Sequence, residues 1–208
     1  MMIISIQGSM AVGKTTLLAN LQKKFPDAVF SYEDVAPVIG DIQRKHLDKT
    51  IIEDYLAIQK LWIAHEVQRY QKVKDYPLVF MDFGAEEIDF YTRFYPQAIG
   101  QEWHVLSSLK NELTQLSYCL PDYIIFLEAR NETLRKRKAS DNTRTRNFFD
   151  FQLEKLLPLK RKWFAKQRNV IFLETDNLSS EEVAQQAAQL ISQMVKKGIN
   201  PKKPQQRF

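Results

Sequence analysis

Eight consecutive residues near the start of the chain have the types and spacing of a loop that binds phosphate groups. They follow the pattern G-x-x-x-x-G-K-[ST] and are Gly8, Ser9, Met10, Ala11, Val12, Gly13, Lys14 and Thr15. The two glycines let main-chain N–H groups close around an anion. In this pattern the lysine reaches the β- and γ-phosphates, and the hydroxyl after it ligates Mg²⁺. We therefore expect these residues and Thr16 to bind ATP, with Thr15 as a ligand of Mg²⁺.

The segments on both sides of this loop support the interpretation. The apolar run 2–6 predicts a strand before the loop, and residues 16–21 predict a helix after it. The amino end of that helix adds the positive end of its dipole to the N–H groups of the loop. An ordinary glycine turn before a helix is the alternative, but such a turn does not require a Lys-Thr pair after its second glycine.

Strand-like and helix-like segments alternate along the rest of the chain. Five runs rich in β-branched and aromatic residues predict strands at 2–7, 27–32, 77–82, 122–128 and 169–174. Helical patterns lie at 14–24, 51–74, 86–97, 102–119, 131–139, 147–167 and 179–197. This alternation predicts an α/β fold in which helices cover both faces of a parallel sheet. Ligands of such sheets bind beyond the carboxyl ends of the strands, so residues at those ends are candidates for a site.

Acids stand at the ends of two predicted strands. Asp82 follows the apolar run 78–81, where a carboxylate can hold Mg²⁺ directly or through water. The alternative for Asp82 is a turn acid or a helix cap. Glu33 follows the second strand, where it can take a proton from a substrate hydroxyl or bind a sugar hydroxyl. We prefer Glu33 as the catalytic base, but the adjacent Asp34 can serve as well, and a surface acid in a loop is the simpler alternative.

Basic residues are concentrated in the segment 130–146, which holds seven basic and two acidic side chains. Arg137 lies on a predicted short helix, a polar loop follows it, and Arg144 and Arg146 open the next helix. Arginine side chains stabilise the charge that phosphoryl transfer places on phosphate oxygens. We therefore interpret residues 130–147 as a lid that closes over ATP, with these three arginines as catalytic groups. A solvated helix face and an RNA-binding patch are the alternatives.

The predicted helix 51–74 carries a polar and aromatic series at helical spacing. The series consists of Tyr55, Gln59, Trp62, His65, Glu66 and Arg69. Such a face can bind a planar base through a hydrogen bond from Gln59 and stacking on Trp62 or Tyr55, although aromatic residues at this spacing usually belong to the core. The three histidines of the chain lack the spacing of zinc ligands, so we expect no zinc site.

Length and composition indicate one globular domain. The chain has 208 residues, of which 44% are hydrophobic and 26% are charged. These values predict one domain at 1–197 and a basic flexible tail at 198–208. The single cysteine, Cys119, excludes an internal disulfide and suits the cytoplasm. We find neither a secretory signal nor an apolar run near the about 20 residues that span a membrane, so we expect no membrane partner.

The net charge of +5 is unevenly distributed. It comes from the segment 130–146 and from the tail, whereas the remainder of the chain is net acidic. The charge pattern therefore does not predict a general nucleic-acid-binding surface. The tail can still act as a tether to RNA or to a membrane, but we favour a solvated terminus.

These features together resemble the kinases of nucleosides and nucleoside monophosphates that carry a phosphate-binding loop (P-loop), most of all the deoxynucleoside kinase branch. The resemblance includes the loop 8–15, the strand-end acids Glu33 and Asp82, the run 121–129, the lid arginines, and the helix 148–163 after the lid. The last strand and helix, 170–175 and 178–183, also fit. One departure is Phe83, because the family usually has an arginine directly after the acid of the third strand. Two more are Pro37, four residues after Glu33 and not directly after it, and Asn147, where the family has a glutamate after the lid arginines.

The resemblance implies a fold, an activity and roles for the site residues. The fold would be the three-layer P-loop NTPase fold, with a five-stranded parallel sheet in the order 2-3-1-4-5, helices on both faces and an arginine-rich lid. The activity would be ATP-dependent transfer of the γ-phosphate to a hydroxyl of a small, nucleoside-like acceptor, with Glu33 as the general base. Because such kinases often form dimers through helices, the resemblance also implies a homodimer.

Three other functions remain open at this stage. The chain can be a kinase of a non-nucleoside metabolite, or a nucleotide-binding switch that has no small-molecule acceptor. A GTPase switch is disfavoured because we find no N-K-x-D motif. An RNA-associated protein would use the basic segment and the tail, and its RNA binding would depend steeply on salt.

Overall fold

A five-stranded parallel sheet forms the centre of the molecule. The computed structural model describes residues 1–141 and 148–197. The strands are β1 (Met2–Gly8), β2 (Val29–Ser31), β3 (Leu78–Asp82), β4 (Tyr123–Glu128) and β5 (Val170–Glu174). They lie in the order β2-β3-β1-β4-β5, and every paired strand is parallel to its neighbour. The predicted fold class and strand order are therefore confirmed, and each predicted strand is present with small shifts at its ends.

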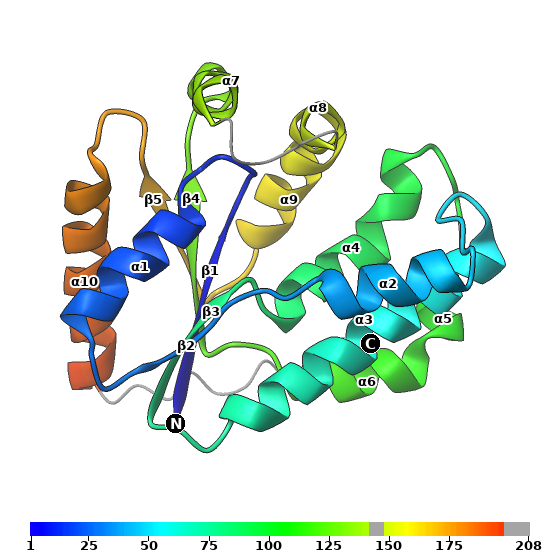
Figure 1. Cartoon of the computed structure of the whole chain (residues 1–208), viewed down its shortest axis with the longest axis horizontal. Helices are drawn as coiled ribbons and strands as arrows, with labels where there is room; N and C mark the ends of the chain where they lie inside the picture. Colours follow the sequence, from blue (N-terminus) through cyan, green and yellow to red (C-terminus); the bar gives the residue numbers. More distant parts are fainter. Residues whose placement is uncertain (142–147, 198–208) are drawn as a thin grey trace.

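Helices cover both faces of this sheet. They are α1 (Lys14–Lys24), α2 (Ala36–Arg44), α3 (Ile52–Val73), α4 (Ala85–Ala98), α5 (Val105–Ser108), α6 (Lys110–Ser117), α7 (Asn131–Ser140), α8 (Phe149–Phe151), the π-helical segment η1 (Gln152–Leu156), α9 (Leu157–Phe164) and α10 (Ser180–Lys197). Helices α1 and α10 pack together on one side of the sheet, and α3, α4 and α6 pack together on the other (Figure 1). Helix α7 directly follows the carboxyl end of β4 (Figure 1).

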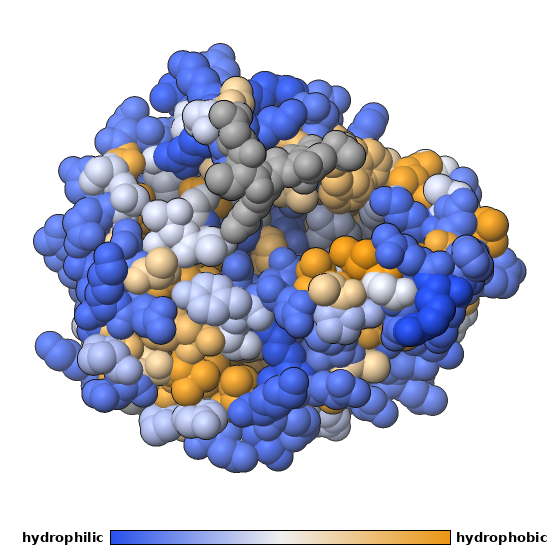
Figure 2. All heavy atoms as spheres, in the orientation of Figure 1, coloured by the Kyte–Doolittle hydropathy of each residue, from blue (hydrophilic) through white to orange (hydrophobic). Residues whose placement is uncertain are grey.

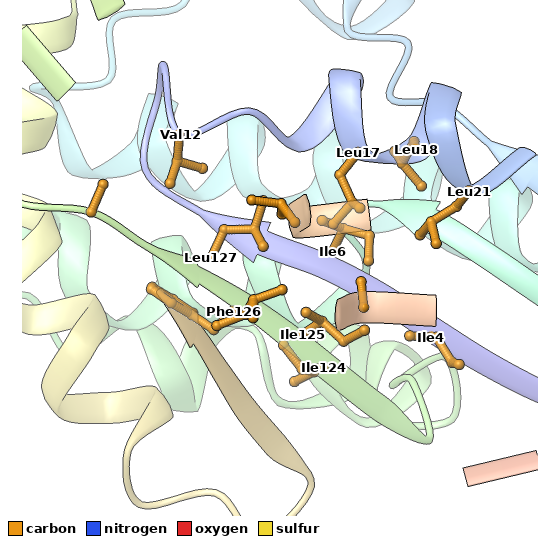
Figure 3. Packing of buried hydrophobic residues seen from close by; sticks show 14 of the residues in the cluster. Ile4, Ile6, Val12, Leu17, Leu18, Leu21, Ile124, Ile125, Phe126 and Leu127 are labelled. Atoms are coloured by element: carbon orange, nitrogen blue, oxygen red, sulfur yellow. The ribbon is translucent and has the colours of Figure 1, made fainter. Parts of the chain in front are cut away.

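Apolar side chains on both faces of the sheet bind these layers together. On one face Leu17, Leu18 and Leu21 of α1 pack over Ile4 and Ile6 of β1, and all five are almost completely buried (Figure 3). Because side chains alternate along a strand, Ile3 points to the other face, where it joins a cluster with Ile63 and Val79. Burial of each such side chain contributes roughly 1.5–3 kcal/mol. The core thus fixes the carboxyl ends of β1, β3 and β4 side by side.

Two helix predictions were incomplete. Helix α2 was not predicted, because Pro37 and Gly40 both have poor helix propensity. Proline is well tolerated in the first turn, however, and here it stands at the start of α2. The helix predicted at 102–119 is two short helices, α5 and α6, which meet at the buried residue Leu109. Helix α2 matters for function, because it forms one wall of the cleft described below.

The predicted lid and the predicted tail lie partly or wholly outside the described residues. Of the predicted lid, the structure describes helix α7, which includes the first two residues of the predicted polar loop 139–143, and Asp141. Residues 142–147, which include Arg144 and Arg146, lie outside the described residues. The predicted tail 198–208 also lies outside them. Within the described residues, none of the helices combines the length and the apolar character that crossing a membrane requires.

Candidate active site

One large cleft opens at the carboxyl ends of the strands. Its volume is about 1740 Å³. At one end it is lined by the phosphate-binding loop and by residues that follow β5 and begin α10. At the other end it is lined by α2, α3 and α4, mostly through apolar and aromatic side chains. Figure 2 shows a hollow on this face of the molecule that is bordered by both polar and apolar side chains. The cleft therefore has a polar end and an apolar end.

The phosphate-binding loop has the backbone that its glycines predict. Gly8 and Gly13 adopt φ angles of 134° and 106°. A Cβ atom at Gly8 would lie 2.6 Å from the main-chain oxygen of Leu127, so only glycine fits there. Ala11 also has a positive φ, 63°, which is unusual for a residue with a side chain. Gly13 is the N-cap of α1, so the loop leads directly into the amino end of a helix.

Lys14 lies across this loop. Its ammonium group donates hydrogen bonds to the main-chain oxygens of Ser9 (2.9 Å) and Gly8 (3.3 Å). It also lies 4.4 Å from the centre of the Phe83 ring. Withdrawal from water and the nearby Lys160 lower the pKa of Lys14 to about 8, against the opposing effect of neighbouring carboxylates. A phosphate group in the loop would supply a further charge partner for the ammonium group.

Of the two acids predicted after β2, only Glu33 lines the cleft. Asp34 instead accepts a hydrogen bond from the main-chain N–H of Ala36 at 3.2 Å, at the start of α2. The Glu33 side chain is exposed on the wall of the cleft, where neighbouring protein atoms partly desolvate its carboxylate. This desolvation, together with the neighbouring carboxylates of Glu87 and Asp82, raises the pKa of Glu33 to about 7. A carboxylate with such a pKa is suited to accept a proton near neutral pH.

The two predicted magnesium ligands both line the cleft. Asp82 ends β3 and is 8% exposed, and Thr15 lies in the first turn of α1. Within the described residues no group of three or more acidic, histidine or cysteine side chains could hold a metal ion by itself. Mg²⁺ in nucleotide sites binds one or two protein oxygens, phosphate oxygens and water. One carboxylate and one hydroxyl therefore suit Mg²⁺ that arrives together with a nucleotide.

Arg69 of α3 holds the ends of β2 and β3 together. Its guanidinium group donates to the side-chain oxygen of Ser31 (2.9 Å) and to the main-chain oxygens of Asp82 (3.0 Å) and Phe83 (3.4 Å). It also pairs with Glu66 at 3.1 Å, and both side chains are largely buried. Burial raises the pKa of Glu66 to about 7, although Arg69 opposes this. Two members of the polar series predicted on this helix are thus structural: they position the strand ends that carry the acids.

Other members of that series do reach the cleft. Tyr55, Gln59 and Trp62 line its apolar end. The Tyr55 hydroxyl donates to the main-chain oxygen of Tyr91 at 2.8 Å. The side-chain oxygen of Gln59 accepts a hydrogen bond from Thr92 at 2.8 Å, which fixes the orientation of its amide. The same helix therefore supplies core, an ion pair and a wall of the cleft, and base binding by α3 stays a prediction.

The arginines of the predicted lid differ in position. Arg137 lines the cleft and donates to the main-chain oxygens of Val12 (3.1 Å) and Thr175 (2.6 Å) and to the Thr175 hydroxyl (3.0 Å). It thus joins the phosphate-binding loop to the segment after β5. Arg144 and Arg146 lie outside the described residues. Of these three arginines, Arg137 is the one within the described residues, and it contacts the phosphate-binding loop at Val12.

Sequence reasoning missed a buried ion pair beside the cleft. The Lys160 ammonium group of α9 donates to Oε1 of Glu87, on α4, at 2.6 Å. Lys160 is 1% exposed and Glu87 is 5% exposed, and Glu87 lines the cleft. Glu87 lies in the first turn of the predicted helix 86–97, a position where acids are common, so its type alone does not indicate a functional role. The one available signal was Lys160 itself, a lysine directly after the apolar run 156–159 in a predicted helix.

Sequence reasoning also missed Gln152 of η1. Its side-chain oxygen accepts hydrogen bonds from the main-chain N–H of Met10 (2.9 Å) and from the Ser9 hydroxyl (3.5 Å). The Gln152 side chain also hydrogen-bonds Tyr91 of α4, which lines the cleft as well. π-Helical turns are rare and often occur at functional sites. Here the turn brings one amide into contact with both the phosphate-binding loop and the apolar end of the cleft.

Comparison with known proteins agrees with this geometry. A protein-family model described as "AAA domain" matches residues 3–156. The chain belongs to this family. The match spans the phosphate-binding loop, the strand-end acids and α7, and ends within η1. No curated protein matches the chain.

Solved structures of two kinases have the same fold as this chain. Deoxyadenosine kinase from M. mycoides, solved with its products dCMP and dCDP, has a TM-score of 0.62 and 15% identity, and the alignment covers 94% of this chain and 100% of that one. Thymidylate kinase from Candida albicans has a TM-score of 0.64 and 21% identity, with 93% and 92% covered. The chain therefore has the fold of P-loop nucleoside and nucleotide kinases, as expected.

Proposed function

We propose that this protein is an ATP-dependent phosphotransferase that moves the γ-phosphoryl group to a hydroxyl of a small, nucleoside-like acceptor. The main supporting observation is that the phosphate-binding loop, several aromatic side chains and Glu33 line one continuous cleft. Two solved structures of the same fold are a nucleoside kinase and a nucleotide kinase. A cleft of about 1740 Å³ has room for two ligands, because single-ligand sites usually measure about 300–1,000 Å³.

The polar end of the cleft is the proposed site for ATP. Main-chain N–H groups of residues 8–16 and the amino end of α1 would bind the phosphates. Lys14 would exchange its main-chain partners for β- and γ-phosphate oxygens. Thr15 and Asp82 would hold Mg²⁺, which neutralises the phosphate charge that grows during transfer.

The aromatic end is the proposed site for the acceptor. Its walls include Gln59, Trp62 and Tyr91, which offer an amide and flat rings to a planar group. Glu33 lies among the lining residues of the same cleft as the loop. An acceptor stacked in this chamber could therefore present a hydroxyl to Glu33 and to the γ-phosphate at once.

In the proposed reaction, Glu33 accepts the proton of the acceptor hydroxyl. The hydroxyl oxygen forms a bond to the γ-phosphorus, the bond from that phosphorus to the β–γ bridging oxygen breaks, and ADP leaves with the bonding electrons. Lys14 stabilises the charge on the transferred group. We propose that Arg144 and Arg146 close over the same group, and that Arg137 acts by fixing the phosphate-binding loop through Val12.

Acceptor-dependent ADP release would test this function. Purified protein is mixed with ATP, Mg²⁺ and, one at a time, ribonucleosides, deoxynucleosides, nucleoside monophosphates and other small hydroxyl compounds. We expect at least one nucleoside-like compound to raise ADP release above the basal rate and to gain one phosphate by mass spectrometry. ADP release that no acceptor raises would refute the proposal and favour a nucleotide-binding switch. A cytoplasmic location and a homodimer stay predictions.

A further inference from the structure

The ion pair between Glu87 and Lys160 connects two helices beside the cleft. Glu87 stands in the first turn of α4 and Lys160 on α9, and these helices pack against each other (Figure 1). The Lys160 ammonium group contacts Glu87 Oε1 at 2.6 Å and lies 5.1–5.7 Å from the ring centres of Phe83, Phe90 and Tyr91. The pair is thus enclosed by aromatic rings and almost completely removed from water.

Only half of the Glu87 carboxylate is satisfied. Oε1 accepts the hydrogen bond from Lys160, whereas the buried Oε2 has no hydrogen-bond partner within the described residues. A buried polar atom without a partner costs about 1–3 kcal/mol, and more if it is charged. A buried ion pair also often contributes less stability than well-packed apolar residues would. Stability alone is therefore a weak reason for a carboxylate at this position.

The pair lies next to the groups that would react. The charge of Glu87 acts on Glu33 and Lys14, and the charge of Lys160 acts on Lys14. Glu87 also acts on Tyr91, and both residues line the acceptor end of the cleft. Lys160 further lies over Phe83, directly after Asp82. Glu87, whose buried Oε2 has no hydrogen-bond partner within the described residues, is therefore part of the wall of the chamber that we assign to the acceptor.

We propose that Glu87 is a second acceptor-binding carboxylate, which takes a hydrogen bond on Oε2 from a hydroxyl or amino group of the acceptor. The group that binds Glu87 differs from the hydroxyl that is phosphorylated, which faces Glu33. Lys160 is a positioning residue: it occupies Oε1 and holds the carboxylate so that Oε2 is available to the ligand. This inference rests on the proposed phosphotransferase function and names the chemistry that its acceptor must carry, a second hydrogen-bond donor.

The test combines three variants with a set of related acceptors. The variants are Glu87→Gln, Lys160→Met and the double variant. The control is the ion pair Lys60–Glu112 between α3 and α6, which lies outside the lining of the cleft and is replaced by Met and Gln. The acceptors are the best compound of the panel above and analogues that each lack one hydroxyl or amino group. If adenosine is that compound, the analogues are 2′-deoxyadenosine, 3′-deoxyadenosine and purine riboside. For each pair, kcat and KM of the acceptor and KM of ATP are measured, and a thermal melt reports folding.

We expect Glu87→Gln to raise the acceptor KM by about tenfold to a hundredfold, because a hydrogen bond to a charged group is lost, and to leave the KM of ATP within about threefold. The analogue that lacks the donor should have a KM with wild type that is raised by a similar factor. Glu87→Gln should raise the KM of that analogue little further, because the hydrogen bond is already absent. The identity of this analogue shows whether the donor is a hydroxyl or an amino group. Lys160→Met should also raise the acceptor KM, and the double variant should be no worse than the worse single variant. The control pair should leave KM unchanged.

Two results separate this inference from the function on which it rests. If wild type turns over no acceptor, the proposed function fails and the inference fails with it. If wild type turns over an acceptor, but Glu87→Gln and Lys160→Met lower only the melting temperature and leave the acceptor KM and the analogue preference unchanged, the pair is purely structural and only the inference is overturned.

Discussion

The pH dependence of the proposed reaction follows from two groups in the cleft. Glu33 must be deprotonated to accept a proton, and its pKa is raised to about 7. Lys14 must be protonated to bind phosphate, and its pKa is lowered to about 8. The rate at low concentrations of both substrates reports the free enzyme. It should therefore rise with pH through about 7 and fall above about 8.

The size of the effect can be worked out from these two values. With one group deprotonated and the other protonated, about 60% of the free enzyme is in the active form at pH 7.5. At about pH 6 or pH 9 this fraction falls to roughly a tenth, so the rate should be about sevenfold below its maximum on either side. Because Glu33 and Lys14 act on each other electrostatically, the two apparent values belong to the pair until variants assign them.

Variants assign each limb of this profile. Glu33→Gln should lower the rate strongly and remove the rising limb. Lys14→Arg keeps its charge at all these pH values, so any residual activity should lack the falling limb. Glu87→Gln removes a negative charge that raises the pKa of Glu33, so the rising limb should move to lower pH. The assay is initial ADP release from pH 5.5 to 9.5 with buffers of constant ionic strength. A flat profile, or a rising limb that survives in Glu33→Gln, would refute the reasoning.

Three further substitutions test other parts of the cleft. Lys14→Ala should abolish turnover without changing the thermal melt, because the side chain is only partly buried and contacts main-chain oxygens of its own loop. Arg144→Ala should lower kcat more than it weakens ATP binding by calorimetry; equal losses would indicate simple binding of the ground state. Arg69→Met should reduce the free energy of unfolding in urea by about 3–5 kcal/mol, because Glu66 would stay buried without its partner. A loss below about 1 kcal/mol in Arg69→Met would show that its contacts to the strand ends contribute little.

Local pattern was sufficient for the parts of the site that are contiguous in sequence. The phosphate-binding loop is specified by glycines at positions that require positive φ, Gly8 and Gly13, and by the residues directly after them. Asp82 could be found because parallel strands end at one edge of the sheet. Strand order followed from the resemblance to a known fold. In each case the information lay within a few residues or in a recurring topology.

Parts of the site that depend on tertiary contacts could not be predicted in this way. Glu87 and Lys160 are 73 residues apart, and nothing near either residue indicates the other. Gln152 reaches Met10 across 142 residues, through a π-helical turn that has no simple sequence signature. Helix α2 was not predicted, because Pro37 and Gly40 have poor helix propensity and the apolar pattern of so short a segment is a weaker signal. Only folding brings these groups to the cleft.

The charges of the cleft make Mg²⁺ a condition for ATP binding and not only for transfer. Glu33, Asp82 and Glu87 all act electrostatically on Lys14, so metal-free ATP would bring its phosphate charge close to three carboxylates. Calorimetry should therefore show that EDTA weakens ATP binding by at least about tenfold, the effect of roughly one lost ion contact. Asp82→Asn removes one repelling charge and one metal ligand. It should bind metal-free ATP more tightly than wild type and Mg²⁺-ATP less tightly. Loss of a metal ligand shifts the two affinities in opposite directions, whereas loss of a general contact shifts both in the same direction. If Asp82→Asn shifts both affinities in the same direction, Asp82 is therefore not a ligand of the metal.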